Sequence, residues 1–174
     1  MCNRGGMSKK LVFAAWFALF FGVAFAQSTE KDPVAIVEIG GATSWNIHGG
    51  AASFGPDFAV EMTPIENWLE IEAGTTPLFY RSSTEWDTDL LFKKPWTLSK
   101  TAEFMFGGGP EWANTRQNGT TTNSIAAEVA GDFMFWPTGK QKFGWYLEPT
   151  YDYDFGRDHE KSIGMSGGLL IAIP

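Results

Sequence analysis

The side chains best suited to general-base chemistry in this sequence are its two histidines, His48 and His159. A serine nucleophile needs such a base within hydrogen-bond distance. Ser162 follows His159 by three residues, so in a β-strand these two side chains would point to opposite faces. His48 has no serine within the next four residues. We therefore predict no catalytic residue and no enzymatic activity.

The same two histidines are candidates for a metal site between two loops. His48 follows the first predicted strand and His159 follows the seventh, and closing an eight-stranded sheet would make their loops neighbours. Asp158 and Glu160 could add carboxylates, and imidazole with carboxylate suits zinc or a similar ion. Because good sites need firmly held ligands, we expect no resident metal; His48 and His159 are the candidates if one binds.

Acidic residues recur at a spacing of two, alternating with apolar side chains. Lys93 is the one basic residue that falls on the acidic face. This face carries eleven acids: Glu38, Glu61, Glu70, Glu72, Asp87, Asp89, Glu103, Glu128, Asp132, Glu148 and Asp152.

Period-two alternation of this kind predicts β-strands, and it recurs in eight segments. No segment after residue 26 keeps the spacing of an amphipathic helix. The strands centre on residues 35–39, 58–62, 69–73, 86–93, 102–106, 125–136, 143–154 and 162–173.

The connections between these strands alternate in character, which predicts a meander with long loops on one rim and short turns on the other. Asn118-Gly119, inside one long connection, predicts a turn. The polar or glycine-rich connections are 47–55, 75–84, 109–123 and 155–160, and the mostly shorter ones are 64–67, 94–100 and 137–142.

Alternation alone does not say whether the apolar face meets a core or lipid. Three features favour lipid. The strands suit the roughly 9–11 residues of a membrane crossing, and aromatic residues lie near strand ends, as in the girdles of membrane barrels. The third feature is an N-terminal export signal without an anchor, because a β protein sent out of the cytoplasm can span lipid only as a closed barrel. The predicted fold class is therefore all-β, an eight-stranded antiparallel up-and-down transmembrane β-barrel. The expected girdle residues are Trp45, Trp68, Trp86, Trp112, Trp136, Phe143, Tyr151 and Tyr153.

The N-terminal segment has the layout of a secretory signal peptide. Arg4, Lys9 and Lys10 precede an uncharged apolar run, residues 11–25, which ends in a small-x-small pattern at Ala26. We predict a cleaved signal peptide over 1–26 and a barrel domain over 27–174. Cleavage would remove three basic residues and no acid, leaving 10 basic and 20 acidic residues and a formal charge of −10.

Composition excludes several functions. A formal charge of −7 argues against nucleic acid as a partner, because phosphate binding needs a basic face. A single cysteine excludes a disulfide framework. No glycine-rich loop lies between a strand and a helix, so we expect no cofactor.

The C-terminal stretch carries a family resemblance, most of all Gly144-Trp145-Tyr146-Leu147-Glu148-Pro149-Thr150-Tyr151-Asp152-Tyr153 with the later Gly167-Gly168-Leu169-Leu170. Residues 27–174 resemble an uncharacterised group of the small eight-stranded outer-membrane β-barrel proteins of Gram-negative bacteria. The resemblance implies a barrel in the bacterial outer membrane with its long loops outside, and no specific activity. The expected partners are outer-membrane lipid, lipopolysaccharide and the outer-membrane assembly machinery, with the protein a monomer.

We expect a non-enzymatic barrel with a structural, surface-contact or minor passage role. One alternative is a soluble, secreted, lipocalin-like carrier with an apolar cavity. Another is a lipid-modifying barrel enzyme, although such enzymes resemble one another in a His-x-Ser pair that this sequence lacks.

Eleven carboxylates facing Lys93 alone would be costly in a narrow lumen, since each buried ion costs several kcal/mol. Some are therefore expected at wet rims, sharing protons, or paired with Arg81, Arg116 or Arg157 reaching in from loops. We expect these acids to form a closed, hydrogen-bonded plug; the alternative is a narrow path lined for cations.

Overall fold

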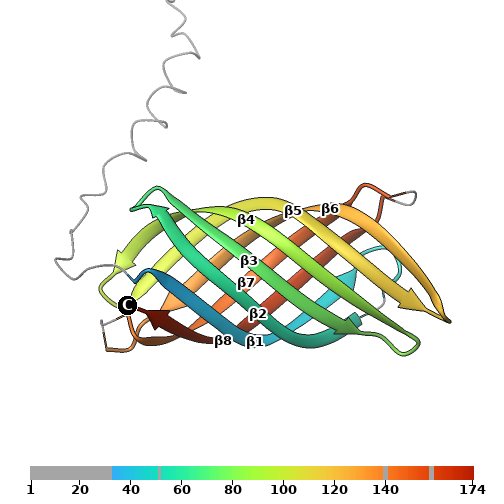
Figure 1. The fold of residues 1–174 in the computed structure, drawn as a ribbon, viewed down its shortest axis with the longest axis horizontal. Coiled ribbons are helices and arrows are strands. Elements are labelled where there is room, and N and C mark those ends of the chain that lie inside the picture. The colour runs from blue at the N-terminus through green and yellow to red at the C-terminus, as the bar shows by residue number, and fades with distance from the viewer. Residues whose placement is uncertain (1–32, 51, 139–140, 157–158) are drawn as a thin grey trace, which may run out of the picture. The chain divides into compact units, whose positions relative to one another are not determined.

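The described part of the chain forms a closed antiparallel barrel (Figure 1). The computed structural model describes residues 33–50, 52–138, 141–156 and 159–174, so the predicted signal peptide lies outside them. The strands are β1 (Ala35–Asn46), β2 (Ala52–Ile65), β3 (Leu69–Phe79), β4 (Ser83–Ser99), β5 (Ala102–Gln117), β6 (Thr120–Phe135), β7 (Phe143–Asp154) and β8 (Lys161–Ile173). Each strand pairs with its neighbour in sequence, and β8 pairs with β1. The predicted eight-stranded up-and-down barrel is confirmed.

The ends of the barrel differ in their connections. The turns β2–β3, β4–β5 and β6–β7 lie at one end together with the start of β1 and the finish of β8; we call this the turn end. The connections β1–β2, β3–β4, β5–β6 and β7–β8 lie at the other, the loop end (Figure 1). Within the described residues, no helix is long and apolar enough to cross a membrane.

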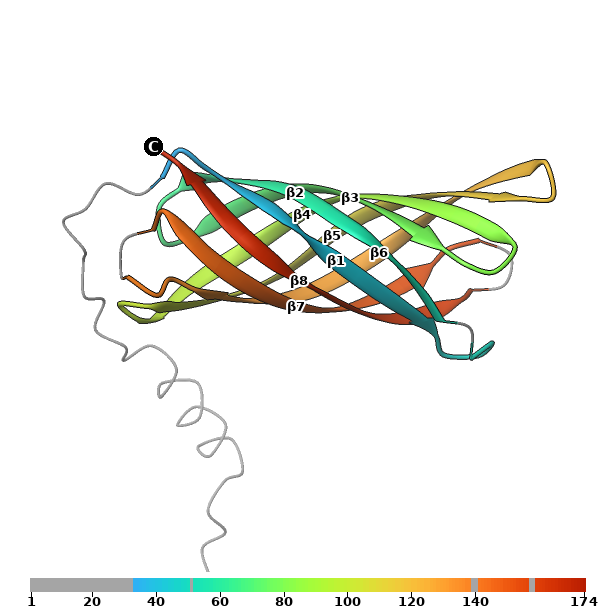
Figure 2. The ribbon, with the colours of Figure 1, turned by 90° about the horizontal axis from the view of Figure 1, so that it is seen from below.

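The long loops expected at 75–84 and 109–123 are wrong, because strand pairing continues through most of both. β5 and β6 pair from Ala102↔Phe135 to Gln117↔Thr120, and two residues connect them. Asn118 and Gly119 both have positive φ, 49° and 79°, as a tight hairpin turn requires. Threonine keeps good strand propensity although it is polar, so a segment with the composition of a loop pairs here as a strand. The resulting hairpin projects at the loop end (Figure 2).

The polarity of the barrel is apolar outside and charged inside. Of the large hydrophobic residues in the described ranges, thirty are exposed, and they lie along every strand. Glu38, Glu61, Lys93 and Asp132, by contrast, are at most 1% exposed. A soluble carrier would show the reverse pattern. The arrangement is the one that membrane barrels show.

Trp136 corrects the expected girdle. Its side chain is 2% exposed and packs inside the barrel, because it has the parity of the inward-facing Met134 and not that of Phe135. Phe135 takes the outer position instead and stacks on Trp145, with ring centroids 4.1 Å apart. Tyr153 is half-buried, and the other six predicted girdle residues are exposed: Trp45, Trp68, Trp86, Trp112, Phe143 and Tyr151.

An arginine in the middle of the outer face is expected to destabilise the barrel in a bilayer. Val129 is 42% exposed and lies on β6 between two levels at which aromatic side chains occur. One level is that of Phe135, and the other is that of Ile125, which pairs with Trp112 on β5. Val129→Arg is expected to lower the free energy of unfolding by about 2–4 kcal/mol if this position faces mid-bilayer lipid. Urea unfolding in phospholipid vesicles measures it.

Thr121→Arg is the matched control, on the same strand and the same face but beyond the aromatic level. Its cost is expected to be at most about 1 kcal/mol. Equal costs at the two positions would show that the outer face does not meet lipid.

Candidate functional site

An apolar plug fills the barrel at the turn end. Six of its inward-facing side chains are buried and pack together: Ile36, Met105, Met134, Trp136, Tyr146 and Leu170. An eight-stranded barrel is barely wider than its own side chains. A cluster containing a tryptophan, a tyrosine and two methionines therefore leaves little free space in the lumen at this level.

A charged layer lies directly next to the plug. Three strands each carry an acid two residues from a plug residue, on the side of the loop end. These acids are Asp132 on β6, Glu148 on β7 and Glu38 on β1. Lys93 enters this layer from β4 with its side chain fully buried. The ammonium of Lys93 lies 2.5 Å from Glu72, contacts Glu148 and is 3.9 Å from Asp132.

The carboxylates of this layer outnumber its one ammonium. Among the described residues, neither oxygen of Glu61 and neither oxygen of Asp132 has a hydrogen-bond partner, and Oε1 of Glu38 has none. All three residues are at most 1% exposed. Buried charges are normally paired or coordinate metals. The carboxylates of this layer could therefore be neutralised by a further positive charge.

Asp57 joins the plug residue Tyr146 to Thr76, which lies further toward the loop end. The hydroxyl of Tyr146 donates a hydrogen bond to Asp57 Oδ2, and Thr76 Oγ1 donates to Oδ1 at 2.7 Å. Gly40 makes room for this contact, since a Cβ at that position would lie 2.6 Å from the Tyr146 hydroxyl oxygen. Both oxygens of Asp57 are therefore satisfied.

An acid-lined well occupies the lumen on the loop side of the charged layer. Its floor includes Glu72 and Glu148, and its upper wall is made by half-buried acids that leave it in communication with solvent. The acids of this acidic well beyond its floor are Asp57, Glu85, Asp87, Asp89, Glu111, Glu128 and Asp152. At the loop end, burial raises the pKa of Tyr80 to about 12, and the negative charges of Glu85 and Asp87 add to the effect.

The structure places all eleven acids of the predicted face away from full solvent exposure. Seven are buried: Glu38, Glu61, Glu70, Glu72, Glu128, Asp132 and Glu148. Four are half-buried: Asp87, Asp89, Glu103 and Asp152. Glu103 lies near the turn end, where the Gln141 amide is 3.5 Å from one of its oxygens.

Three lumen acids were missed from the sequence. Asp57, Glu85 and Glu111 fell just outside the predicted strands, although each has the parity of the acids in its own strand. Extending the alternation by one to five residues would have found them. Thr115 donates a 2.6 Å hydrogen bond to Glu85, which shows that this part of β5 is still paired with β4.

The arginines do not enter the lumen as expected. Arg81 and Arg116 are exposed, whereas Lys93 lies inside the barrel and pairs there with Glu72, Glu148 and Asp132. Arg157 lies outside the described residues. The side chains of Arg81 and Arg116 lie at loop-end positions, where water solvates them at less cost than a narrow lumen would.

The two histidine loops are neighbours, but the described residues do not form a histidine site. His48 and His159 line one depression, and Asn46 donates a 2.9 Å hydrogen bond to Glu160 across the loops. His159 stacks on Tyr153. The groups of three or more metal-binding side chains found in the described residues contain only carboxylates, and Asp158 lies outside those residues.

The fold and its polarity define a class: a small eight-stranded meander barrel of the outer-membrane type, apolar outside and charged within. The chain matches no protein-family model and no curated protein.

Solved structures with this fold are similar to the chain. Neisserial surface protein A (NspA) superposes with a TM-score of 0.67 at 12% identity, covering 83% of this chain and all of that one. Ail, the attachment invasion locus protein of Yersinia pestis, gives a TM-score of 0.52 at 13% identity, covering 81% of this chain and all of Ail. At these identities the likeness shows the fold alone.

Lys93 is expected to hold the charged layer together. Lys93→Met leaves Glu72, Glu148 and Asp132 without their counter-charge, and breaking a buried pair from one side costs about 3–5 kcal/mol of unfolding free energy. Urea unfolding in detergent micelles measures it.

Lys94→Met is the matched control, because Lys94 is half-exposed, contacts the Asn67 carbonyl and should lose at most about 1 kcal/mol. Adding Glu72→Gln and Glu148→Gln to Lys93→Met should restore part of the stability, since the two carboxylates in direct contact with the ammonium are then neutral. Equal losses for the two lysines would contradict the role of Lys93.

Proposed function

We propose that this protein is a non-enzymatic, sealed β-barrel of the bacterial outer membrane that anchors hairpins at the cell surface. The observation that carries the proposal is the apolar plug, which closes the lumen at the turn end. A barrel blocked in this way serves as an anchor and not as a pore, so the surface-contact role is favoured over passage of solutes.

The β5–β6 hairpin supplies the surface for contact. Beyond the level of Trp112 and Ile125 it continues as a polar ribbon, with Asn114 donating a 2.6 Å hydrogen bond to Asn123 across the strands. The names of the similar barrels, a neisserial surface protein and an attachment protein, agree with such a role.

The partner is expected to differ chemically from the ligand in one solved structure of Ail. Ail has been solved with the heparin analogue sucrose octasulfate, a polyanion. The present chain has a formal charge of −7, and its well is lined by acids. Like charges repel, so a polyanionic partner is not favoured.

The geometry of His159 supports a non-enzymatic role. The ring of His159 stacks on Tyr153, whereas the Ser162 hydroxyl donates a 3.0 Å hydrogen bond to Asp152. No hydrogen bond of the described residues joins this histidine and serine. The pair therefore lacks the contact that would activate a nucleophile.

The outer face supports lipid and lipopolysaccharide as the surroundings of a monomer delivered by the outer-membrane assembly machinery. Exposed apolar side chains lie on all eight strands, so burial by lipid accounts for the whole circumference without a second copy. A lipocalin-like carrier is disfavoured because the interior is charged.

Epitope tags test the location and orientation. A tag inserted between Asn118 and Gly119 is expected to bind antibody on intact cells, because this turn lies at the loop end. The same tag between Lys100 and Thr101, at the turn end, should bind only after the cells are opened. Recovery of folded protein in a detergent-free periplasmic wash, or labelling of both tags on intact cells, would overturn the proposal.

Planar bilayers test the seal. The native protein is expected to give no conductance, whereas Trp136→Ala with Met105→Ala, which removes two fully buried plug side chains, should give small cation-selective events. Trp112→Ala with Phe106→Ala is the control, since both of these side chains are exposed on the outer face. Large, stable steps from the native protein would show that the plug does not close the lumen.

A further inference from the structure

We propose that the charged layer binds one hard divalent cation of the size of calcium, through the carboxylates of Glu38, Glu72 and Asp132. This ion site goes beyond the anchoring role and does not depend on it. A barrel with any surface function, or none, could hold the ion.

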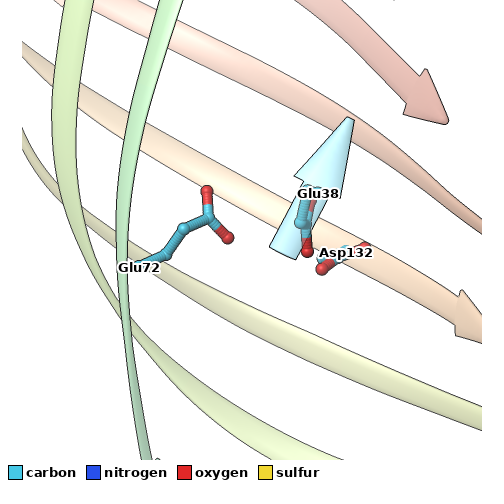
Figure 3. Close-up of side chains that lie close together, drawn as sticks. All are labelled: Glu38, Glu72 and Asp132. Atoms are coloured by element: carbon cyan, nitrogen blue, oxygen red, sulfur yellow. The ribbon is translucent and has the colours of Figure 1, made fainter. Parts of the chain in front are cut away.

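The three carboxylates converge from separate strands. Glu38 lies on β1, Glu72 on β3 and Asp132 on β6, and one oxygen from each lies within 4.8 Å of the other two. In Figure 3 the carboxylate of Glu72 points across the lumen toward Glu38 and Asp132. Paired strands of a closed barrel hold all three, so the ligands are positioned by rigid elements and not by loops.

Glu61 provides a second, independent observation. It is 1% exposed, and neither of its oxygens has a hydrogen-bond partner among the described residues. It lies directly opposite Glu72 in the β2–β3 ladder. Directly opposite residues in a ladder have Cβ atoms about 4.5–5.5 Å apart, so Glu61 is a neighbour of the triad member Glu72. A buried carboxylate without a hydrogen-bond partner beside the triad adds a negative charge that a bound cation would neutralise.

Lys93 does not remove the need for a cation. Its ammonium is engaged by Glu72 and Glu148 and stays 3.9 Å from Asp132. The layer then holds five carboxylates, those of Glu38, Glu61, Glu72, Asp132 and Glu148, for one ammonium. Buried charges are tolerated when they are paired or coordinate a metal. A divalent ion supplies the missing charge at the point where the oxygens meet.

The ligand set favours calcium over magnesium. Calcium takes about six to eight oxygen ligands, carboxylates among them, in a flexible geometry. Magnesium demands a near-ideal octahedron and keeps several firmly held waters, for which a narrow lumen leaves little room. Buried carboxylates that converge from three strands therefore suit calcium.

The acidic well supplies a route to the site. It is lined from the loop side by half-buried acids such as Asp87, Glu111 and Asp152, and its floor includes Glu72, a member of the triad. Rings of carboxylates attract cations and repel anions. An ion therefore reaches the charged layer from the loop end, while the plug blocks the turn end.

Equilibrium dialysis with radioactive calcium tests the proposal on the native protein purified in detergent. We expect one calcium per barrel at constant ionic strength, displaced at least tenfold less effectively by magnesium than by unlabelled calcium. Glu38→Gln with Asp132→Asn should weaken binding at least tenfold. If this pair does not fold, as judged by heat-modifiable mobility on gels, Glu61→Gln alone should weaken binding severalfold.

Glu111→Gln with Asp152→Asn is the matched control. These residues belong to a second carboxylate group higher in the well, so the variant removes the same number of charges without touching the triad, and it should keep the single calcium. No calcium binding by the native protein would show that protons neutralise the layer and would overturn the proposal. Binding that persists without the triad, or that both variants lose equally, would overturn it as well. None of these outcomes bears on the sealed anchor.

Discussion

Closure of the sheet between β1 and β8 is the constraint on which the other features depend. The two strands pair from Ala35↔Ile173 to Asn46↔Ser162, so no strand in the barrel is left with an open edge. Backbone groups satisfied in this way let the outer surface be apolar on every strand, because nothing polar on the backbone remains to be solvated. Closure also turns one face of each strand toward a lumen whose diameter is small and is set by the number of strands.

The narrow lumen explains how apolar and charged side chains are arranged along the barrel axis. Large apolar side chains fill the turn end without any need for partners, whereas charged side chains need a counter-charge or water. The charged layer has Lys93, and the acids beyond it have solvent from the loop end. The side chains of the interior therefore pass from apolar to acidic along the barrel axis, with the ion pairs of Lys93 at the boundary.

The sequence predicted the number of strands, their order, the closing pair and the inward face, because all of these follow from period-two alternation. It did not predict where the strands end. Thr120 to Asn123 pair with β5 although their residue types are those of a loop. It also could not show which acids converge. Glu38, Glu72 and Asp132 are distant in sequence, and only the stagger between strands brings them to one level. Trp136 lies near a strand end, as a girdle residue would, but it shares the inward alternation of Met134 and is buried.

The plug bounds the acidic well on the side of the turn end. In a channel, whatever enters on one side leaves on the other. In the sealed barrel that we propose, the well would exchange ions with the medium at the loop end alone. The ions in the well would then reflect the composition of that medium at equilibrium, and a concentration gradient across the membrane would not change them.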